Sequence, residues 1–222
     1  LHRRRHSFPT RRSSDLVNVW NGKQWSEVVV RKTGSDQKLV TVTLSNGSKI
    51  ECTEYHKFIL SDGTRVSAKE LTPGTKLIKS SFPVLKDGED FKYAYTHGAF
   101  CGDGTTYGPD DNIKKFKKIS LYPGKHDIKD FLEHRTESAS EDSSGRITLV
   151  LPKDLQDKFV VPVNASISSK LDWFAGFCDT DGTVHRNGDC ESISVSNTNF
   201  EFLNDIRLML LSLGVDSKIS PL

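Results

Sequence analysis

Two nine-residue stretches decide the fold of this 222-residue chain: THGAFCGDG at residues 96–104 and FAGFCDTDG at residues 174–182. They align at a constant offset of 78 residues, which matches Gly98 to Gly176. A unit repeated at one offset predicts an internal duplication about a pseudo-twofold axis.

The glycines in these stretches predict close helix packing. Gly98 and Gly102 lie four residues apart on one helix face, and Gly176 and Thr180 repeat the spacing. Glycine costs about 0.8–1 kcal/mol in a helix interior. Because small residues let helix backbones approach closely, we expect the two helices to pack against one another at these positions.

Asp103 and Asp181 are the candidate metal ligands. Each ends its predicted helix, and the glycines that follow, Gly104 and Gly182, are expected to adopt the left-handed conformation. A carboxylate at the negative end of a helix is unfavourable, and two brought together repel, so a divalent cation such as Mg²⁺ would relieve the strain. Paired carboxylates holding Mg²⁺ also suit phosphodiester cleavage. The alternative is that each Asp-Gly pair merely ends a helix.

Residues 17–83 are predicted to be all-β. LVTVTL at residues 39–44 is strongly β-prone, and Asn46-Gly47 predicts a two-residue type I′ hairpin turn into residues 49–52. The pattern repeats over residues 58–66 around an Asp-Gly pair. No helical periodicity interrupts this segment.

The chain changes character after Pro83. Residues 84–90 read as a polar linker, and beyond them helical patches alternate with short strands, which is typical of an α+β domain. Strands are predicted at residues 119–122, 147–151 and 192–195, a short amphipathic helix around residues 128–132, and a longer helix opened by a capping box at Thr198 and closed by Gly214.

Composition excludes several classes of protein. Hydrophobic residues make up 35% of the chain, enough for a core, and no run approaches the roughly 20 apolar residues of a membrane span. The four cysteines form no C-x-x-C pair, which favours a reducing compartment over a disulfide scaffold. We therefore expect a cytoplasmic monomer without a membrane partner.

Residues 1–16 look foreign to the rest of the chain. Their sequence, LHRRRHSFPTRRSSDL, resembles a translated sequencing adapter, while a targeting peptide and a functional arm are the alternatives. Without their five arginines and one acid, the net charge falls from +2 to −2, so overall basicity does not argue for nucleic-acid binding. Lys114 to Lys118 form the densest basic run elsewhere, either a phosphate-contacting surface or an ordinary solvated loop.

The two motifs resemble those of the LAGLIDADG homing endonucleases in their single-chain, two-motif form. The resemblance covers residues 91–222, with a first repeat at residues 91–168 and a second, incomplete repeat at residues 169–222. The first motif is degenerate, because Cys101 stands where the family often has Asp and Gly102 where it has Ala.

This resemblance implies a metal-dependent endonuclease that cuts double-stranded DNA. Asp103 and Asp181 would be the metal-binding catalytic acids, one for each strand, with Mg²⁺ also held by the carbonyl groups of Gly102 and Thr180. A DNA-binding module of the same fold whose catalytic site has decayed remains an alternative.

A second resemblance concerns residues 17–83. CTEYHKF at residues 52–58 and the later A-x-E-L-x-x-G-x-K-L from residue 68 resemble the N-terminal splicing half of an intein, which has a Hint fold, and the likeness is greatest to inteins of ribonucleotide reductase large subunits. Large inteins commonly carry an endonuclease inserted in the Hint domain.

The intein resemblance assigns roles to two residues. His56 would protonate the amide nitrogen that leaves during splicing, and Thr53 would hold the carbonyl or developing oxyanion. Cys52 reads as a buried strand residue rather than a nucleophile. The partners would be the flanking host protein segments. A Hint autoprocessing domain with an unrelated insert is the other reading.

Two blocks of the intein pattern are not found in the sequence. The nucleophilic first block would precede Val17, and the closing His-Asn pair is not seen. We therefore expect that the chain alone gives no ligated product and that its second repeat leaves part of a core exposed.

Overall fold

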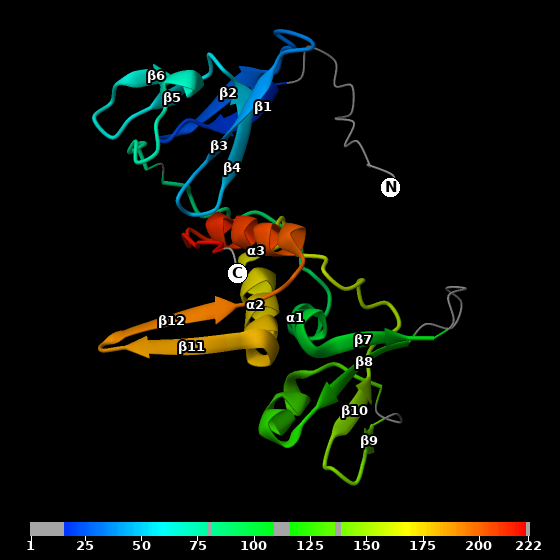
Figure 1. Cartoon of the computed structure of the whole chain (residues 1–222). Coiled ribbons are helices and arrows are strands. Elements are labelled where there is room, and N and C mark those ends of the chain that lie inside the picture. The colour runs from blue at the N-terminus through cyan, green and yellow to red at the C-terminus, as the bar shows by residue number, and fades with distance from the viewer. Residues whose placement is uncertain (1–15, 80, 109–115, 136–138, 221–222) are drawn as a thin grey trace. The chain divides into compact units, whose positions relative to one another are not determined.

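The computed structural model describes residues 16–79, 81–108, 116–135 and 139–220 (Figure 1). They belong to two compact units, one made of residues 1–82 with 218–222 and the other of residues 83–217. The foreign-looking arm up to residue 15, and Lys114 and Lys115 of the basic run, lie outside the described residues.

The described residues of the first unit form antiparallel hairpins. The pairs are β1 (Leu16–Trp20) with β2 (Trp25–Val29), β3 (Leu39–Thr43) with β4 (Lys49–Thr53), and β5 (Lys57–Ile59) with β6 (Arg65–Ser67), followed by the 3₁₀ helix η1 (Ala68–Glu70). Cys52 of β4, Phe58 of β5 and Ala68 of η1 form a small buried core.

The hairpin between β3 and β4 is confirmed, but its predicted turn type is wrong. Leu44 and Ser48 close a loop of three residues rather than two, since the amide of Leu44 donates to the carbonyl of Ser48 at 2.8 Å. Gly47 has a positive φ of 85°, whereas Asn46 does not take the left-handed conformation that a type I′ turn requires at both central positions.

The second unit mixes helices and sheets. Its elements are α1 (Ala94–Asp103), β7 (Gly104–Tyr107), β8 (Phe116–Leu121), the 3₁₀ helix η2 (Pro123–Phe131), β9 (Ser140–Glu141), β10 (Ile147–Val150), α2 (Ile167–Asp181), β11 (Gly182–Asn187), β12 (Cys190–Val195) and α3 (Phe200–Ser212). Strands β7-β8-β10-β9 form one antiparallel sheet, and β11 and β12 form a separate ribbon.

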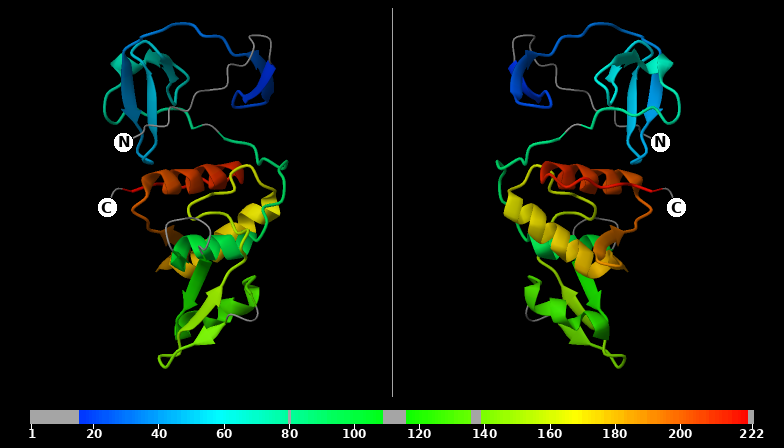
Figure 2. Two further views of the ribbon diagram at one scale, coloured as in Figure 1. Left: turned by 90° about the vertical axis from the view of Figure 1, so that its right-hand side faces the viewer. Right: turned by 90° about the vertical axis from the view of Figure 1, so that its left-hand side faces the viewer.

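Helices α1 and α2 lie side by side (Figure 2). Their predicted contact at the glycines is confirmed. A Cβ atom at Gly98 would lie 1.9 Å from the carbonyl oxygen of Trp173, and one at Gly176 would lie 2.1 Å from that of Tyr95. No side chain fits in such a space, so the backbones of the two helices touch where the sequence places its glycines.

Two cores flank this helix pair. On one side, Phe100 of α1 packs with the inward residues of the four-stranded sheet, which include Ile119 and Leu149. On the other, Trp173 of α2 packs with residues of α3 such as Phe202. The helix pair is thus held by apolar packing on both sides.

The glycines after the two acids depart from the prediction. Gly104 has φ −76° and Gly182 has φ −80°, so both are extended rather than left-handed. Each helix passes directly into a strand, which requires the extended conformation. Glycine is needed there because an added Cβ atom would lie 2.4 Å from the carbonyl oxygen of Phe100 or Cys178.

Two smaller predictions are also corrected. Asn199, not Thr198, caps α3, because its side chain accepts a hydrogen bond from the amide of Phe202 at 3.1 Å. The short helix predicted around residues 128–132 falls within the 3₁₀ segment η2.

Residues 84–90 belong to the second unit and bond to later segments of it. The amide of Leu85 donates to the carbonyl of Ser212, and the carbonyl of Glu89 accepts from the amide of Ser166, each at 2.9 Å. In the part of the chain that the structure describes, no helix is both long and apolar enough to cross a membrane.

Candidate functional site: a pair of acids at abutting helix ends

Asp103 and Asp181 are neighbours across the helix interface. They are the last residues of α1 and α2, whose backbones already touch. A Cβ atom at Gly102 would lie 3.2 Å from Cγ of Asp181 and 2.2 Å from Oγ1 of Thr180. The carboxyl group of Asp181 therefore lies beside the residue that precedes Asp103.

The pKa of Asp181 reflects this position. Burial raises it above the usual value for an aspartate, and the negative charge of Asp103 raises it further, while Lys125 and Lys158 act in the opposite direction. Keeping both carboxylates ionised is thus unfavourable without additional positive charge.

Lys125 supplies part of that charge. Its Nζ donates to the carboxylate of Asp103 and, at 2.7 Å, to the carbonyl oxygen of Thr180. One ammonium group from η2 therefore joins the end of α1 to the end of α2.

Lys158, from another segment of the chain, bonds to the end of α1. Its Nζ donates to the carbonyl oxygen of Gly102 at 3.0 Å and to that of Gly104 at 2.7 Å. A cation is favourable at the negative end of a helix, so both lysines complement the ends on which the acids lie.

The sequence alone does not identify these two lysines as site residues. In sequence, Lys125 is 22 residues from Asp103, and Lys158 is 56 residues from Gly102. A lone lysine in a polar segment carries no distinguishing pattern. A weak signal exists for Lys125 alone, because it follows a predicted strand and a Pro-Gly turn.

The oxygen atoms at this site suit a hard divalent cation. Two carboxylates and the carbonyl groups of Gly102 and Thr180 form an all-oxygen donor set, the kind that Mg²⁺ prefers. Among the described residues, no group of three or more His, Cys, Asp or Glu side chains could hold a metal ion. The residues therefore fit a cation that keeps water or phosphate oxygens among its ligands, and not a cage made by the protein alone.

A buried histidine locks the same helix pair. Nε1 of Trp173 donates to Nδ1 of His97 at 2.8 Å, so Nδ1 is unprotonated, and Nε2 of His97 donates to the carbonyl of Asp157 at 3.0 Å. Burial lowers the pKa of His97 to about 4. The imidazole is thus neutral and joins α1 to α2 as a structural group.

The solvent face of the four-stranded sheet carries both polar and apolar side chains. Lys118 lies opposite Thr105 and Val150 in the ladder, and its ammonium lies 5.1 Å from the centre of the Tyr107 ring. Further along this face, the hydroxyl groups of Ser120 and Thr148 approach to 3.4 Å.

The basic run divides between the two faces of this sheet. Lys118 points to the solvent face, whereas the neighbouring Lys117 bonds to the carbonyl of Leu155 and pairs with Asp157 at 3.0 Å. Of the two lysines of the run that the structure describes, only Lys118 is thus placed to contact a ligand on the solvent face.

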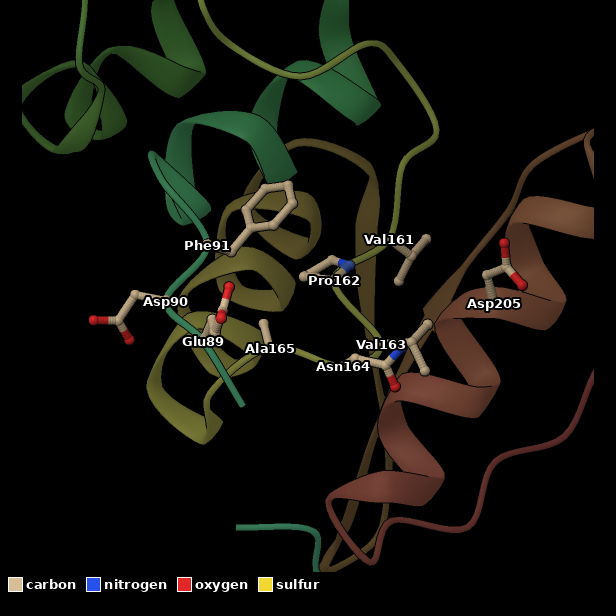
Figure 3. A pocket seen from close by; sticks show the side chains of 9 residues that line it. All are labelled: Glu89, Asp90, Phe91, Val161, Pro162, Val163, Asn164, Ala165 and Asp205. Carbon is tan, nitrogen blue, oxygen red and sulfur yellow. The ribbon is translucent and has the colours of Figure 1, made fainter. Parts of the chain in front are cut away.

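A shallow cavity of about 440 Å³ lies elsewhere on the second unit (Figure 3). Phe91 and Ala165 in its lining precede α1 and α2, so it adjoins the ends of these helices that are opposite to the acid pair. Burial and the charge of Glu201 raise the pKa of Asp205, which reaches the cavity from α3. The cavity is therefore separate from the predicted site.

The two predicted splicing residues lie close together in the first unit. Thr53 ends β4 and is half-buried, and His56 follows in an exposed turn closed by a 3.0 Å bond from its amide to the carbonyl of Thr53. The His56 ring lies against Phe58, with ring centres 5.4 Å apart. Cys52 is buried, as predicted. The catalytic roles of Thr53 and His56 stay predictions.

Known proteins are similar to parts of this chain. Residues 168–221 match the family model of the LAGLIDADG-like domain. Over 93% of its length the chain is 42% identical to part of the ribonucleoside-diphosphate reductase large subunit of Invertebrate iridescent virus 6. A further 42-residue match, 19% of the chain, is 50% identical to part of a DNA gyrase subunit of Synechocystis sp..

The extent of these matches is informative. The chain spans 23% of the reductase subunit and 4% of the gyrase subunit. A match to nearly all of the chain but to less than a quarter of a reductase is consistent with an intein inserted in such a subunit, which confirms the predicted resemblance. The chain therefore carries a LAGLIDADG-like domain at residues 168–221.

Proposed function

We propose that the chain is part of an intein whose second unit is a homing endonuclease that cuts double-stranded DNA. The adjacency of Asp103 and Asp181 at the abutting ends of α1 and α2 carries the proposal. It places one carboxylate from each repeat at a single site, beside carbonyl oxygens that suit Mg²⁺.

The residues divide the chemistry among them. Asp103 and Asp181 would hold Mg²⁺ together with the carbonyl groups of Gly102 and Thr180. The bound ion would act as a Lewis acid on the scissile phosphate and neutralise the leaving oxyanion. Lys158, whose ammonium bonds to the carbonyl oxygens of Gly102 and Gly104, would add a fixed positive charge beside the site.

The solvent face of the four-stranded sheet is the proposed DNA surface. Lys118 would contact a backbone phosphate, and the hydroxyl groups of Ser120 and Thr148 would donate to phosphates or base edges. The shared face of these residues, set by the strand register, supports the proposal.

A plasmid cleavage assay tests the nuclease. A supercoiled plasmid carrying an uninterrupted reductase large-subunit sequence should become linear with Mg²⁺ and stay intact with EDTA. Asp181→Asn should abolish cutting. Asp179→Asn is the matched control, because Asp179 lies on the same helix and its carboxylate accepts a 2.6 Å hydrogen bond from the hydroxyl group of Tyr95. Cutting by Asp181→Asn at the parent rate would refute the proposed metal site.

A DNA-binding module without nuclease activity is the second candidate. The ion pair between Lys125 and Asp103 favours it, because it satisfies that carboxylate without a metal ion. This candidate predicts specific binding to the same plasmid in a gel-shift assay with no linear product at any Mg²⁺ concentration.

For residues 17–83 we propose the N-terminal part of a Hint splicing domain. His56 would protonate the leaving amide nitrogen and Thr53 would hold the carbonyl group. The turn that brings the two residues together and the exposure of His56 support these roles.

In an intein that contains residues 17–83 between its host flanks, His56→Ala should reduce the yield of spliced product measured by mass spectrometry. His126→Ala, in the second unit, should splice as the parent does. Splicing by His56→Ala at the parent rate would contradict the proposed role of His56.

A further inference from the structure

We propose that Lys125 is a resident counter-ion of the acid pair, which a divalent cation must displace in order to bind. The inference rests on the proposed nuclease function and adds to it a step that precedes catalysis. It follows from which atoms already contact the oxygens of the site.

Most of the proposed ligand oxygens already have an ammonium partner. The ammonium of Lys125 donates hydrogen bonds to the carboxylate of Asp103 and to the carbonyl of Thr180. The ammonium of Lys158 donates to the carbonyl of Gly102. Among the described residues, neither lysine forms an ion pair with Asp181. The two acids are therefore unequal: Asp103 has a direct ion-pair partner, and Asp181 has none among the described residues.

The charges explain why Lys125 and a divalent cation cannot occupy the site together. Two ammonium groups beside two carboxylates make a set without net charge. A divalent cation placed among the same oxygens would add two positive charges and would need atoms that Lys125 occupies. Because Lys125 competes for both a carboxylate and a carbonyl oxygen, it opposes cation binding more than any residue that only lies nearby.

The position of Lys125 allows it to move. Its side chain is 33% exposed and flexible, so the ammonium can turn toward solvent when a cation arrives. Lys158, in contrast, bonds to two carbonyl groups of one chain segment, Gly102 and Gly104, and contacts no carboxylate among the described residues. We assign the exchange to Lys125 and a fixed positive charge to Lys158.

Calorimetric titration of the 222-residue chain with Mg²⁺ or Ca²⁺, without DNA and at constant ionic strength, tests this exchange. Lys125→Met should bind the cation about tenfold more tightly than the parent, the factor expected for one charge-assisted hydrogen bond to a partly exposed group. Lys129→Met is the matched control, because Lys129 lies on the same 3₁₀ segment without contacting the acid pair, and it should bind as the parent does.

Thermal unfolding separates competition from simple support of the fold. Lys125→Met should melt below the parent in EDTA, because the two carboxylates then repel without compensation, and should recover at saturating cation. A merely structural lysine would lower the melting temperature equally in both conditions, and that result would overturn the proposal. If Lys125→Met does not fold, Lys125→Arg should fold and bind the cation no more tightly than the parent.

The outcomes distinguish this inference from the proposed function. Unchanged affinity in Lys125→Met, with binding still lost in Asp181→Asn, would overturn the lysine exchange alone. Cation binding that Asp181→Asn leaves intact, or no binding by any variant, would overturn the nuclease site and the exchange together.

Discussion

The two repeats share a helix that ends in Asp-Gly but differ in the sheet that follows it. In the first repeat, β8 lies between β7 and β10, and its residue Ile119 is 1% exposed. In the second, β11 and β12 form a ribbon on which Val184 and Ile193, directly opposite each other, are 58% and 57% exposed. The helix contact depends on residues within each motif, whereas the burial of a sheet depends on segments that lie far along the chain.

The repeats also differ in their polar groups. His97 has Ala175 as its counterpart at the same offset, so only the first repeat contributes a buried imidazole at this position. Asp103 is paired with Lys125, while Asp181 has a raised pKa. A symmetrical backbone thus carries an asymmetrical site.

The largest expected effect tests the symmetry of the helix contact. Gly98→Ala and Gly176→Ala should each destabilise the second unit by about 3 kcal/mol or more, because the new methyl group would overlap a carbonyl oxygen of the other helix. Gly124→Ala, with no atom within 4 Å of its added Cβ, is the control. Urea unfolding of all three variants measures the difference. A free energy of unfolding equal to that of the parent, for either Gly98→Ala or Gly176→Ala, would show that the two helices do not contact each other equivalently.

The second effect tests the difference between the sheets. Ile119→Ala should cost about 2–4 kcal/mol, because it leaves a cavity in a packed core. Ile193→Ala should change stability by no more than about 0.5 kcal/mol, since that side chain is exposed. Equal losses in urea unfolding would mean that the ribbon of the second repeat is covered in solution.

The third effect concerns the histidine found in one repeat only. Because burial lowers the pKa of His97 from 6.5 to about 4, the neutral imidazole stabilises the fold above pH 6.5, and this contribution is lost as the pH falls toward 4. The maximum loss is about 3 kcal/mol. His97→Gln should remove this part of the pH dependence in urea unfolding, and His126→Gln should retain it. A parent-like pH profile for His97→Gln would contradict the assignment.

The smallest effect compares the two acids. The raised pKa of Asp181 means that the fold disfavours its ionised form, so Asp181→Asn should stabilise the cation-free protein by about 0.5–1 kcal/mol. Asp103→Asn should give no such gain, because it leaves Lys125 without its carboxylate. Differential scanning calorimetry in EDTA compares the two, and equal shifts would show that the two acids are equivalent.

Short-range patterns made part of this architecture predictable. The glycine spacing predicted the contact of α1 and α2, and the Asp-Gly pairs predicted which acids would meet, because both depend on positions within one motif. The hairpin of β3 and β4 was predictable for the same reason. The length of its loop was not predictable, because the choice between two and three loop residues depends on which residues of the two strands form the last hydrogen bond of the ladder.

Features set by distant residues could not be predicted. The conformation of Gly104 depends on the strand that follows it, and the partners of Asp103 and Gly102 come from separate segments. Apart from the Pro-Gly turn before Lys125, nothing in the local sequence distinguishes it from Lys129, which lies on the same segment. Long-range ion pairs of this kind require the fold.

The central claim is that the two acids form one site, and a carbon-13 NMR titration of their carboxyl groups tests it most directly. In the cation-free protein, the pKa of Asp181 should lie above that of an ordinary aspartate and should fall in Asp103→Asn, because a neighbouring negative charge is removed. An ordinary pKa for Asp181 that does not change in this variant would show that the two carboxylates do not face each other.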